Sequence, residues 1–272
     1  MGVAKAIAPG TVFGGDYEIE RTLAAGGMGA VYVARQRSTQ KLRALKTLLP
    51  EYVADPTMRA RFAREAIAGA QIESDHIVEV LAAGVDEPSG TPWIAMEFLA
   101  GADLADRVKD GGVMSTADVT EVLRQLGHAL TAAHRVGVVH RDLKPENIFL
   151  ANARREGAAF TVKVLDFGIA KLVHAARTHV TTSAMGSPLW MAPEQTDSSL
   201  PITPATDVWA VGLIAFWLLT GTHYWRTPRM PNATIGAMIR ELLAEPLDAA
   251  SARAAEFGAS GFAMGPAYQR GG

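Results

Sequence analysis

The stretch that decides the fold of this chain is residues 138–148, which read Val138-Val139-His140-Arg141-Asp142-Leu143-Lys144-Pro145-Glu146-Asn147-Ile148. Taken alone, an aspartate or asparagine in such a loop is more often a turn former than a chemically active group. Two further segments follow in the chain, Asp166-Phe167-Gly168 and then Ala192-Pro193-Glu194. The three segments in this order make a chance coincidence negligible, so their polar residues are candidates for a functional site.

The three segments resemble the catalytic loop H-R-D-L-x-x-x-N, the D-F-G motif and the A-P-E motif of protein kinases. The resemblance covers about residues 17–225 well and residues 226–246 weakly. Residues 26–29 and 191–195 look like those of the bacterial, Hanks-type Ser/Thr kinases. The resemblance implies an α+β fold with two lobes: an antiparallel sheet with one helix in the first lobe, and mainly helices in the second.

The same resemblance implies transfer of the γ-phosphoryl group of ATP to Ser or Thr hydroxyls of proteins. The transition state is loose, so the protein mainly positions groups and neutralises charge. By resemblance, Asp142 accepts the proton of the substrate hydroxyl, and Lys144 lies near the transferring phosphate and favours Ser/Thr over tyrosine substrates. Asn147 and Asp166 match the positions that hold Mg²⁺, or Mn²⁺ in its place, because such hard cations prefer oxygen ligands.

A glycine-rich turn lies near the start of the chain. It resembles the kinase loop that covers the phosphates, with Gly26, Gly27 and Gly29 in the turn and Ala24 where the first glycine belongs. Glycine at such positions lets backbone amides approach phosphates closely. We therefore expect Ala24 to weaken ATP binding modestly if it keeps strand geometry.

Lys46 matches the strand lysine that pairs with the α/β-phosphates in kinases. A charged side chain inside an apolar strand needs a partner, and Glu65, on the helix that follows, stands at the family's ion-pair position. The residues that the resemblance places around adenine, with Met96 as gatekeeper and residues 97–99 as hinge, are Leu23, Val31, Ala44, Met96, Glu97, Leu99 and Phe149.

Periodicity and turn residues predict the elements. Strands are expected at residues 17–25, 29–35, 42–48, 77–84 and 93–98, and helices at residues 55–72 and from 115 to Gly137. The apolar run 208–219 is expected to be a buried helix. The predicted organisation is an N-terminal extension (1–16), a first lobe (17–98), a second lobe that is incomplete at its end (99–246) and an irregular tail (247–272).

The C-terminal region departs from the resemblance. Residues 257–272 contain five glycines in sixteen residues, which disfavours a helix. The arginine that pairs with the A-P-E glutamate in kinases is expected in a helix there, but Arg270 stands between Gln269 and two terminal glycines. We therefore expect Glu194 to lack its usual partner and the helix at 208–219 to keep exposed apolar surface.

The composition agrees with a globular protein of one or two domains. The chain has 272 residues, 49% of them hydrophobic, a formal net charge of −2 and no cysteine. The absence of cysteine excludes disulfides and thiolate chemistry. The small net charge gives no reason to expect nucleic acid as a partner. No membrane segment is expected, and a cytoplasmic location is compatible. The oligomeric state cannot be inferred.

Regulation is expected between the D-F-G and A-P-E segments. Arg141 directly precedes Asp142, the arrangement of kinases that are activated by phosphorylation of this loop, and Thr181 and Thr182 are the preferred sites. Two other functions remain open. One is a pseudokinase that acts as a signalling scaffold, and the other is a small-molecule phosphotransferase of related fold.

Overall fold

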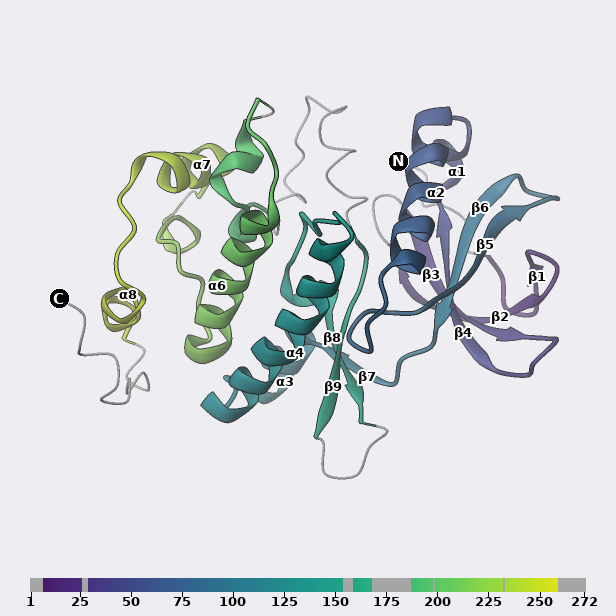
Figure 1. Ribbon diagram of the computed structural model, residues 1–272, viewed down its shortest axis with the longest axis horizontal. Helices are drawn as coiled ribbons and strands as arrows, with labels where there is room; N and C mark the ends of the chain where they lie inside the picture. Colours follow the sequence, from purple (N-terminus) through teal and green to yellow (C-terminus); the bar gives the residue numbers. More distant parts are fainter. Residues whose placement is uncertain are drawn as a thin grey trace.

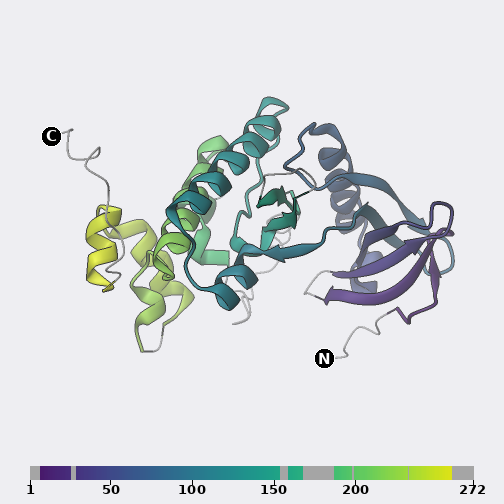
Figure 2. The same cartoon turned by 90° about the horizontal axis from the view of Figure 1, so that it is seen from below.

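The computed structural model describes residues 7–25, 29–153, 159–167, 187–197, 199–231 and 233–258. Within these residues the chain forms two lobes, a sheet with a helix against it and a larger body of helices (Figures 1 and 2). This confirms the predicted fold class.

The first lobe is built on an antiparallel sheet with the strand order β1-β2-β3-β4-β6-β5. Its strands are β1 (Val12–Phe13), β2 (Tyr17–Ala25), β3 (Gly29–Gln36), β4 (Leu42–Leu48), β5 (Val80–Asp86) and β6 (Thr91–Glu97). The five predicted strands are confirmed within a few residues. Strand β1 was not predicted, because residues 1–16 were taken as an extension.

The two faces of this sheet are covered differently. On one face Phe13 is buried with Tyr17 and Trp93, whose rings lie 5.1 Å apart, so the start of the chain belongs to the first lobe and is not a separate extension. On the other face helix α2 (Pro56–Gln71) buries Met58 and Phe62 against the sheet. A short helix, α1 (Pro50–Val53), precedes α2 and was not predicted. Alternation of side chains along each strand supplies both apolar faces.

A second, three-stranded sheet lies where the chain enters the larger lobe. It contains β7 (Gly101–Asp103), β8 (Ile148–Asn152) and β9 (Phe160–Val164) in the order β7-β8-β9. Gly101 has a φ of +141°, and a Cβ atom there would lie 2.1 Å from the carbonyl oxygen of Leu150. Glycine is therefore required for β7 to pair with β8 directly after the hinge.

The larger lobe packs helices around one core. They are α3 (Leu104–Gly111), α4 (Thr116–Arg135), α6 (Pro204–Thr220), α7 (Ile235–Ala244) and α8 (Ala250–Glu256), with 3₁₀ turns η1 (Pro145–Asn147), η3 (Ser187–Trp190), η4 (Pro193–Thr196) and η5 (Thr227–Arg229). Helix α4 begins where predicted, since the Ser115 hydroxyl accepts the Asp118 N–H at 3.1 Å. Among the described residues, no helix is long and apolar enough to span a bilayer.

The predicted exposure of the helix at 208–219 holds only for a small part of α6. Val208 is 62% exposed, whereas Ile214 and Leu218 are fully buried among the side chains of the core. The exposed apolar surface on this helix is therefore much smaller than predicted.

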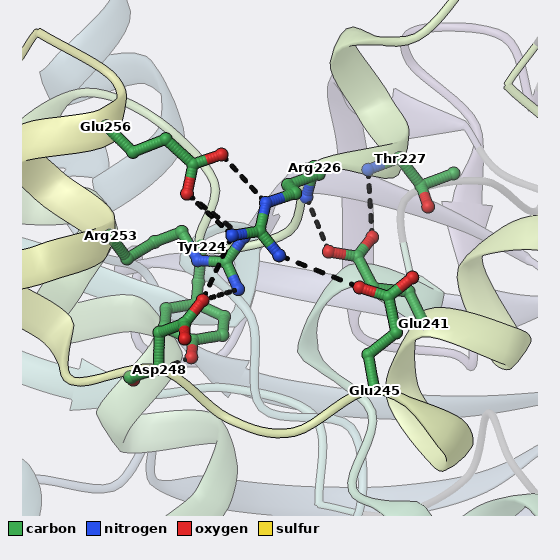
Figure 3. A network of polar contacts seen from close by, with 8 residues as sticks. All are labelled: Tyr224, Arg226, Thr227, Glu241, Glu245, Asp248, Arg253 and Glu256. Carbon is green, nitrogen blue, oxygen red and sulfur yellow. Dashed lines mark hydrogen bonds and ion pairs between the residues drawn. The ribbon is translucent and has the colours of Figure 1, made fainter.

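The prediction of an irregular tail over 247–272 is wrong for its first part, because residues 250–256 form α8. That segment is rich in alanine, the strongest helix former, and the glycines that argued against a helix lie further on. Figure 3 shows how α8 is held: the Arg226 guanidinium contacts carboxylates of Glu245, Asp248 and Glu256. Arg270 lies outside the described residues.

Candidate active site

A buried carboxylate from α6 holds the loop between α4 and β8. Asp207 is 1% exposed, and its two oxygens accept the backbone N–H groups of His140 and Arg141, each at 2.9 Å. The Nε2 atom of His134, at the end of α4, lies 2.8 Å from the same carboxylate. Three partners thus compensate the burial of this charge and fix the backbone just before Asp142.

The three polar residues that the sequence placed in this loop do come together. The Asn147 Nδ2 atom donates to the backbone oxygen of Asp142 at 2.8 Å, and the Lys144 Nζ atom lies 3.3 Å from Asp142 Oδ2. Asp142 is only 8% exposed. Because the amide nitrogen of Asn147 is held by Asp142, its Oδ1 atom is the one left to bind a cation.

Asp166 follows directly on strand β9 and meets Lys46 from the other lobe. The Nζ atom of Lys46 lies 2.7 Å from Asp166 Oδ1. Burial opposes ionisation of Asp166, but the Lys46 charge and hydrogen bond, with smaller contributions from His140 and Lys144, outweigh it and lower its pKa below 3.8. Glu65 lies on α2, but its side chain lies outside the described residues, so the predicted Lys46–Glu65 pair stays a prediction.

The backbone of the D-F-G segment is fixed by the catalytic loop. The His140 Nε2 atom hydrogen-bonds to the Leu165 carbonyl oxygen at 2.8 Å, and the Leu165 N–H donates to the Asn147 carbonyl at 2.9 Å. The Phe167 ring is buried and lies 4.8 Å from the imidazole of His140. Asp166 itself has a φ of +52°, a strained conformation for a residue with a Cβ atom.

The expected adenine-binding residues of the first lobe share one face of the sheet. Val31 pairs with Lys46, and Ala44 pairs with Met96, so these side chains point to the same side of β3, β4 and β6. A cavity of about 20 Å³ is lined by Met96 together with Asp166 and Phe167.

The remaining residues that the resemblance places around ATP lie on or beside other strands of the two sheets. Leu23 is on β2, Gly29 begins β3, Phe149 is on β8, and Leu99 follows β6. Ala24 pairs with Val31 and therefore keeps strand geometry, the condition that the sequence analysis set for its tolerance. Gly26, Gly27, Thr181 and Thr182 lie outside the described residues.

The sequence analysis missed the partner of the hinge glutamate. Lys163 Nζ lies 2.5 Å from Glu97 Oε1, which also accepts the Glu79 N–H at 3.1 Å. The sequence offers only a weak signal for this pair, a lysine in a short apolar strand three residues before Asp166. The side chain of Glu97 is therefore engaged with β9, and its backbone N–H donates to the Glu79 carbonyl oxygen at 3.0 Å.

The A-P-E segment also contacts the catalytic loop. The Gln195 Nε2 atom donates to the Arg141 carbonyl oxygen at 2.8 Å. Glu194 accepts a hydrogen bond from the Thr206 hydroxyl at 2.5 Å. No ion pair of Glu194 is present within the parts of the chain that are described, and Arg270 lies outside them, so the predicted lack of an arginine partner stays a prediction.

The family model described as "Protein kinase domain" matches residues 17–257. The chain belongs to the protein kinase domain family. Serine/threonine-protein kinase Pkn1 of Myxococcus xanthus is 43% identical over 209 residues, which are 76% of this chain and 29% of Pkn1. Serine/threonine-protein kinase PknJ of Mycobacterium tuberculosis is 38% identical over 219 residues, which are 80% of this chain and 36% of PknJ.

A solved structure has the same fold. The crystal structure of the Mycobacterium tuberculosis PknI kinase domain superposes with a TM-score of 0.63 at 25% identity, covering 93% of this chain and 98% of that domain. This kinase chain therefore matches nearly a whole solved kinase domain. It spans only about a third of the length of the two curated relatives.

Proposed function

We propose that this kinase domain transfers the γ-phosphoryl group of ATP to Ser or Thr hydroxyls of protein substrates, in the cytoplasm, where ATP is supplied. The observation that carries the proposal is the Lys46–Asp166 contact of 2.7 Å. It brings a cation of the first lobe to the carboxylate beside the catalytic loop. The activity and the substrates of the whole protein are part of the same proposal.

The residues of the catalytic loop supply the base and a positive charge. Asp142 is the proposed base: its backbone oxygen accepts from Asn147 Nδ2 at 2.8 Å and its Oδ2 atom at 3.4 Å, and the carboxylate held there can accept the proton of a substrate hydroxyl as that oxygen attacks. Lys144 lies 3.3 Å from it and is placed to neutralise charge on the transferring group. A serine or threonine hydroxyl is the proposed acceptor because Lys144 occupies the position typical of Ser/Thr kinases.

The proposed cation site fits the chemistry of its donors. Asn147 Oδ1 and the Asp166 carboxylate are hard oxygen ligands, which suit Mg²⁺ and also Mn²⁺. A bound cation would neutralise phosphate charge in the transition state. Lys46, from the opposite lobe, would bind the α/β-phosphates. Its contact with Asp166 would also hold the two lobes together at this point.

The test is phosphorylation of a generic protein substrate with labelled ATP, followed by identification of the labelled amino acid. Asp142→Asn keeps the shape of the base but removes its charge. A positioned general base typically raises the reaction rate roughly 10²–10⁴-fold. We expect a loss of that size, with label on serine or threonine in the wild type. The control is Asp110→Asn, an exposed aspartate of α3. An inactive wild type that still binds ATP would favour a scaffold.

We also propose that phosphorylation of Thr181 or Thr182 activates the domain, because a phosphate there could pair with Arg141. One to three charge-assisted hydrogen bonds from the phosphate should raise the rate of phosphoryl transfer about tenfold or more. The double variant Thr181→Ala/Thr182→Ala is therefore expected to lose at least that factor. Mass spectrometry of the active wild type should find phosphate on this segment. Full activity of the double variant would contradict the proposal.

A further inference from the structure

We propose that Gln195 is a positioning residue for the catalytic base, acting through the peptide bond between Arg141 and Asp142. The inference rests on the proposed kinase function and assigns a role to a residue that lies directly after the A-P-E segment. Through this contact, the residue after the A-P-E segment would fix the position of Asp142. The contact uses the Arg141 carbonyl oxygen, so it does not depend on a phosphate bound by the Arg141 guanidinium.

Both ends of the Gln195 carboxamide are engaged. Its Oε1 atom accepts the Ala192 N–H at 3.0 Å, within the same 3₁₀ turn, η4. Its Nε2 atom donates to the Arg141 carbonyl oxygen at 2.8 Å, in a segment 54 residues away. The first bond needs an acceptor and the second a donor, and the carboxamide supplies both.

Arg141 needs such support because it has a φ of +67°, in the left-handed region that residues with a Cβ atom rarely adopt. Strained residues persist where the surrounding structure holds them. Asp207 accepts the Arg141 N–H at 2.9 Å, and Gln195 binds the Arg141 carbonyl. The two peptide groups on either side of the strained residue are thus held by side chains from two different elements, α6 and η4.

The peptide group that Gln195 holds is the one that leads into the base. Its oxygen belongs to Arg141 and its N–H to Asp142, and that N–H lies 3.3 Å from the Nδ1 atom of His140. Because His140 Nε2 is bonded to the Leu165 carbonyl, the Nδ1 atom is free to accept. Rotation of this peptide would break the bonds at both ends and move Asp142. Docking of η4 on the catalytic loop therefore fixes the base.

Gln195 also has a purely structural task, since its bond to Ala192 closes the η4 turn. The two tasks can be separated by chemistry. In Gln195→Glu the carboxylate still accepts from Ala192 but cannot donate to Arg141, and it repels that carbonyl. In Gln195→Leu both bonds are lost. Thr196→Val is the matched control, because among the described residues the Thr196 hydroxyl bonds within the turn, to the Pro193 carbonyl.

The experiment measures kcat and the KM for ATP of the full chain and these variants, with thermal melting as a check on folding. We expect Gln195→Glu to lower kcat about tenfold, with KM for ATP within about twofold and Tm nearly unchanged, because one hydrogen bond and a repulsion are at stake. Thr196→Val should retain wild-type kcat.

The pH profile gives a readout that turn closure alone would not move. A protonated carboxyl at position 195 can donate to Arg141, so the kcat of Gln195→Glu relative to wild type should recover as the pH falls from about 7 to about 4.5, toward the ordinary glutamate pKa of about 4.3. Gln195→Leu should show no such recovery. An unchanged kcat in Gln195→Glu, a loss matched by Thr196→Val, or a loss without pH recovery would overturn the inference. An inactive wild type would instead overturn the proposed function.

Discussion

Lys46 and Asp166 lie 120 residues apart in the chain, and their side chains meet at 2.7 Å. The pair crosses from one lobe to the other and leaves Asp166 40% exposed toward the gap. A carboxylate of lowered pKa is a suitable cation ligand, because its ionised form is favoured. The same lowered pKa gives stability a defined pH dependence.

The first prediction concerns that pH dependence. The folded-state pKa of Asp166 lies below 3.8, so the stability that its charge contributes is fully present above that value and is lost as the pH falls through the folded pKa. The difference in Tm between wild type and Asp166→Asn should therefore be constant from about pH 5 to pH 8 and shrink below about pH 4. Thermal melts without nucleotide across this range measure it. A difference that grows toward acid pH would contradict the assignment of Lys46 as the dominant partner.

At the residue scale, motifs identified the groups that would act on ATP, but they did not identify the contacts of Lys163 and Gln195 that support them. Asp142, Lys144 and Asn147 come together as predicted, because they lie within six consecutive residues of one loop. Lys163 and Glu97 are separated by 66 residues, and Gln195 and Arg141 by 54. Such pairs depend on where two elements meet in space, for which a single sequence gives no local pattern.

At the scale of elements, long alternating strands were predictable and short ones were not. Strand β4 lies at Leu42–Leu48, as predicted. Strands β7, β8 and β9 have three to five residues each, too few for alternation to be distinguished from a loop. Helix α8 has seven residues, and helix propensity alone is a weak guide at this length.

Strand β3 begins at a glycine that packing requires. A Cβ atom on Gly29 would lie 2.3 Å from the Thr47 carbonyl oxygen of β4, a distance that forces the two strands apart. We expect Gly29→Ala to cost about 1–3 kcal/mol of unfolding free energy, as overpacking does, and to weaken ATP binding. Urea unfolding and ATP titration measure the two effects.

The control for this variant is Gly212→Ala on α6. An added Cβ atom there has no neighbour within 4 Å, and alanine favours a helix by about 1 kcal/mol over glycine. The control should therefore be neutral or stabilising. Equal stability of Gly29→Ala and wild type would show that β3 can move away from β4 without cost.

On the scale of the whole molecule, the two lobes are joined by more than the hinge. The Val78 N–H donates to the Val164 carbonyl at 3.0 Å, and the Val164 N–H donates to the His76 carbonyl at 2.8 Å. These bonds join the segment after α2 to strand β9, which ends two residues before Asp166. Backbone hydrogen bonds thus tie the segment between α2 and β5 to the strand that leads to the proposed cation ligand.

The far end of the larger lobe depends on two arginines with different roles. The Arg226 guanidinium is partly exposed and pairs with three carboxylates, whereas Arg253 is 2% exposed, its Cζ atom lies 4.8 Å from the ring centroid of Tyr224, and its Nη2 atom donates to Asp248 Oδ2 at 2.8 Å (Figure 3). The Nε and Nη1 atoms of Arg253 are buried and have no hydrogen-bond partner among the described residues. Its stabilising contribution should therefore come from packing more than from charge.

The last prediction separates these contributions at Arg253. Arg253→Ala removes the packing and should lower the free energy of unfolding by about 2 kcal/mol, or the Tm by roughly 4–8 °C for a domain of this size. Arg253→Met keeps most of the volume and removes the unsatisfied N–H groups, so its Tm should equal or exceed that of the wild type. Asp248 is not left without a cation in either variant, because Arg226 Nη2 lies 3.0 Å from it. Thermal melting of the three proteins decides the question. An Arg253→Met variant as unstable as Arg253→Ala would show that the buried charge itself holds α8 on the lobe.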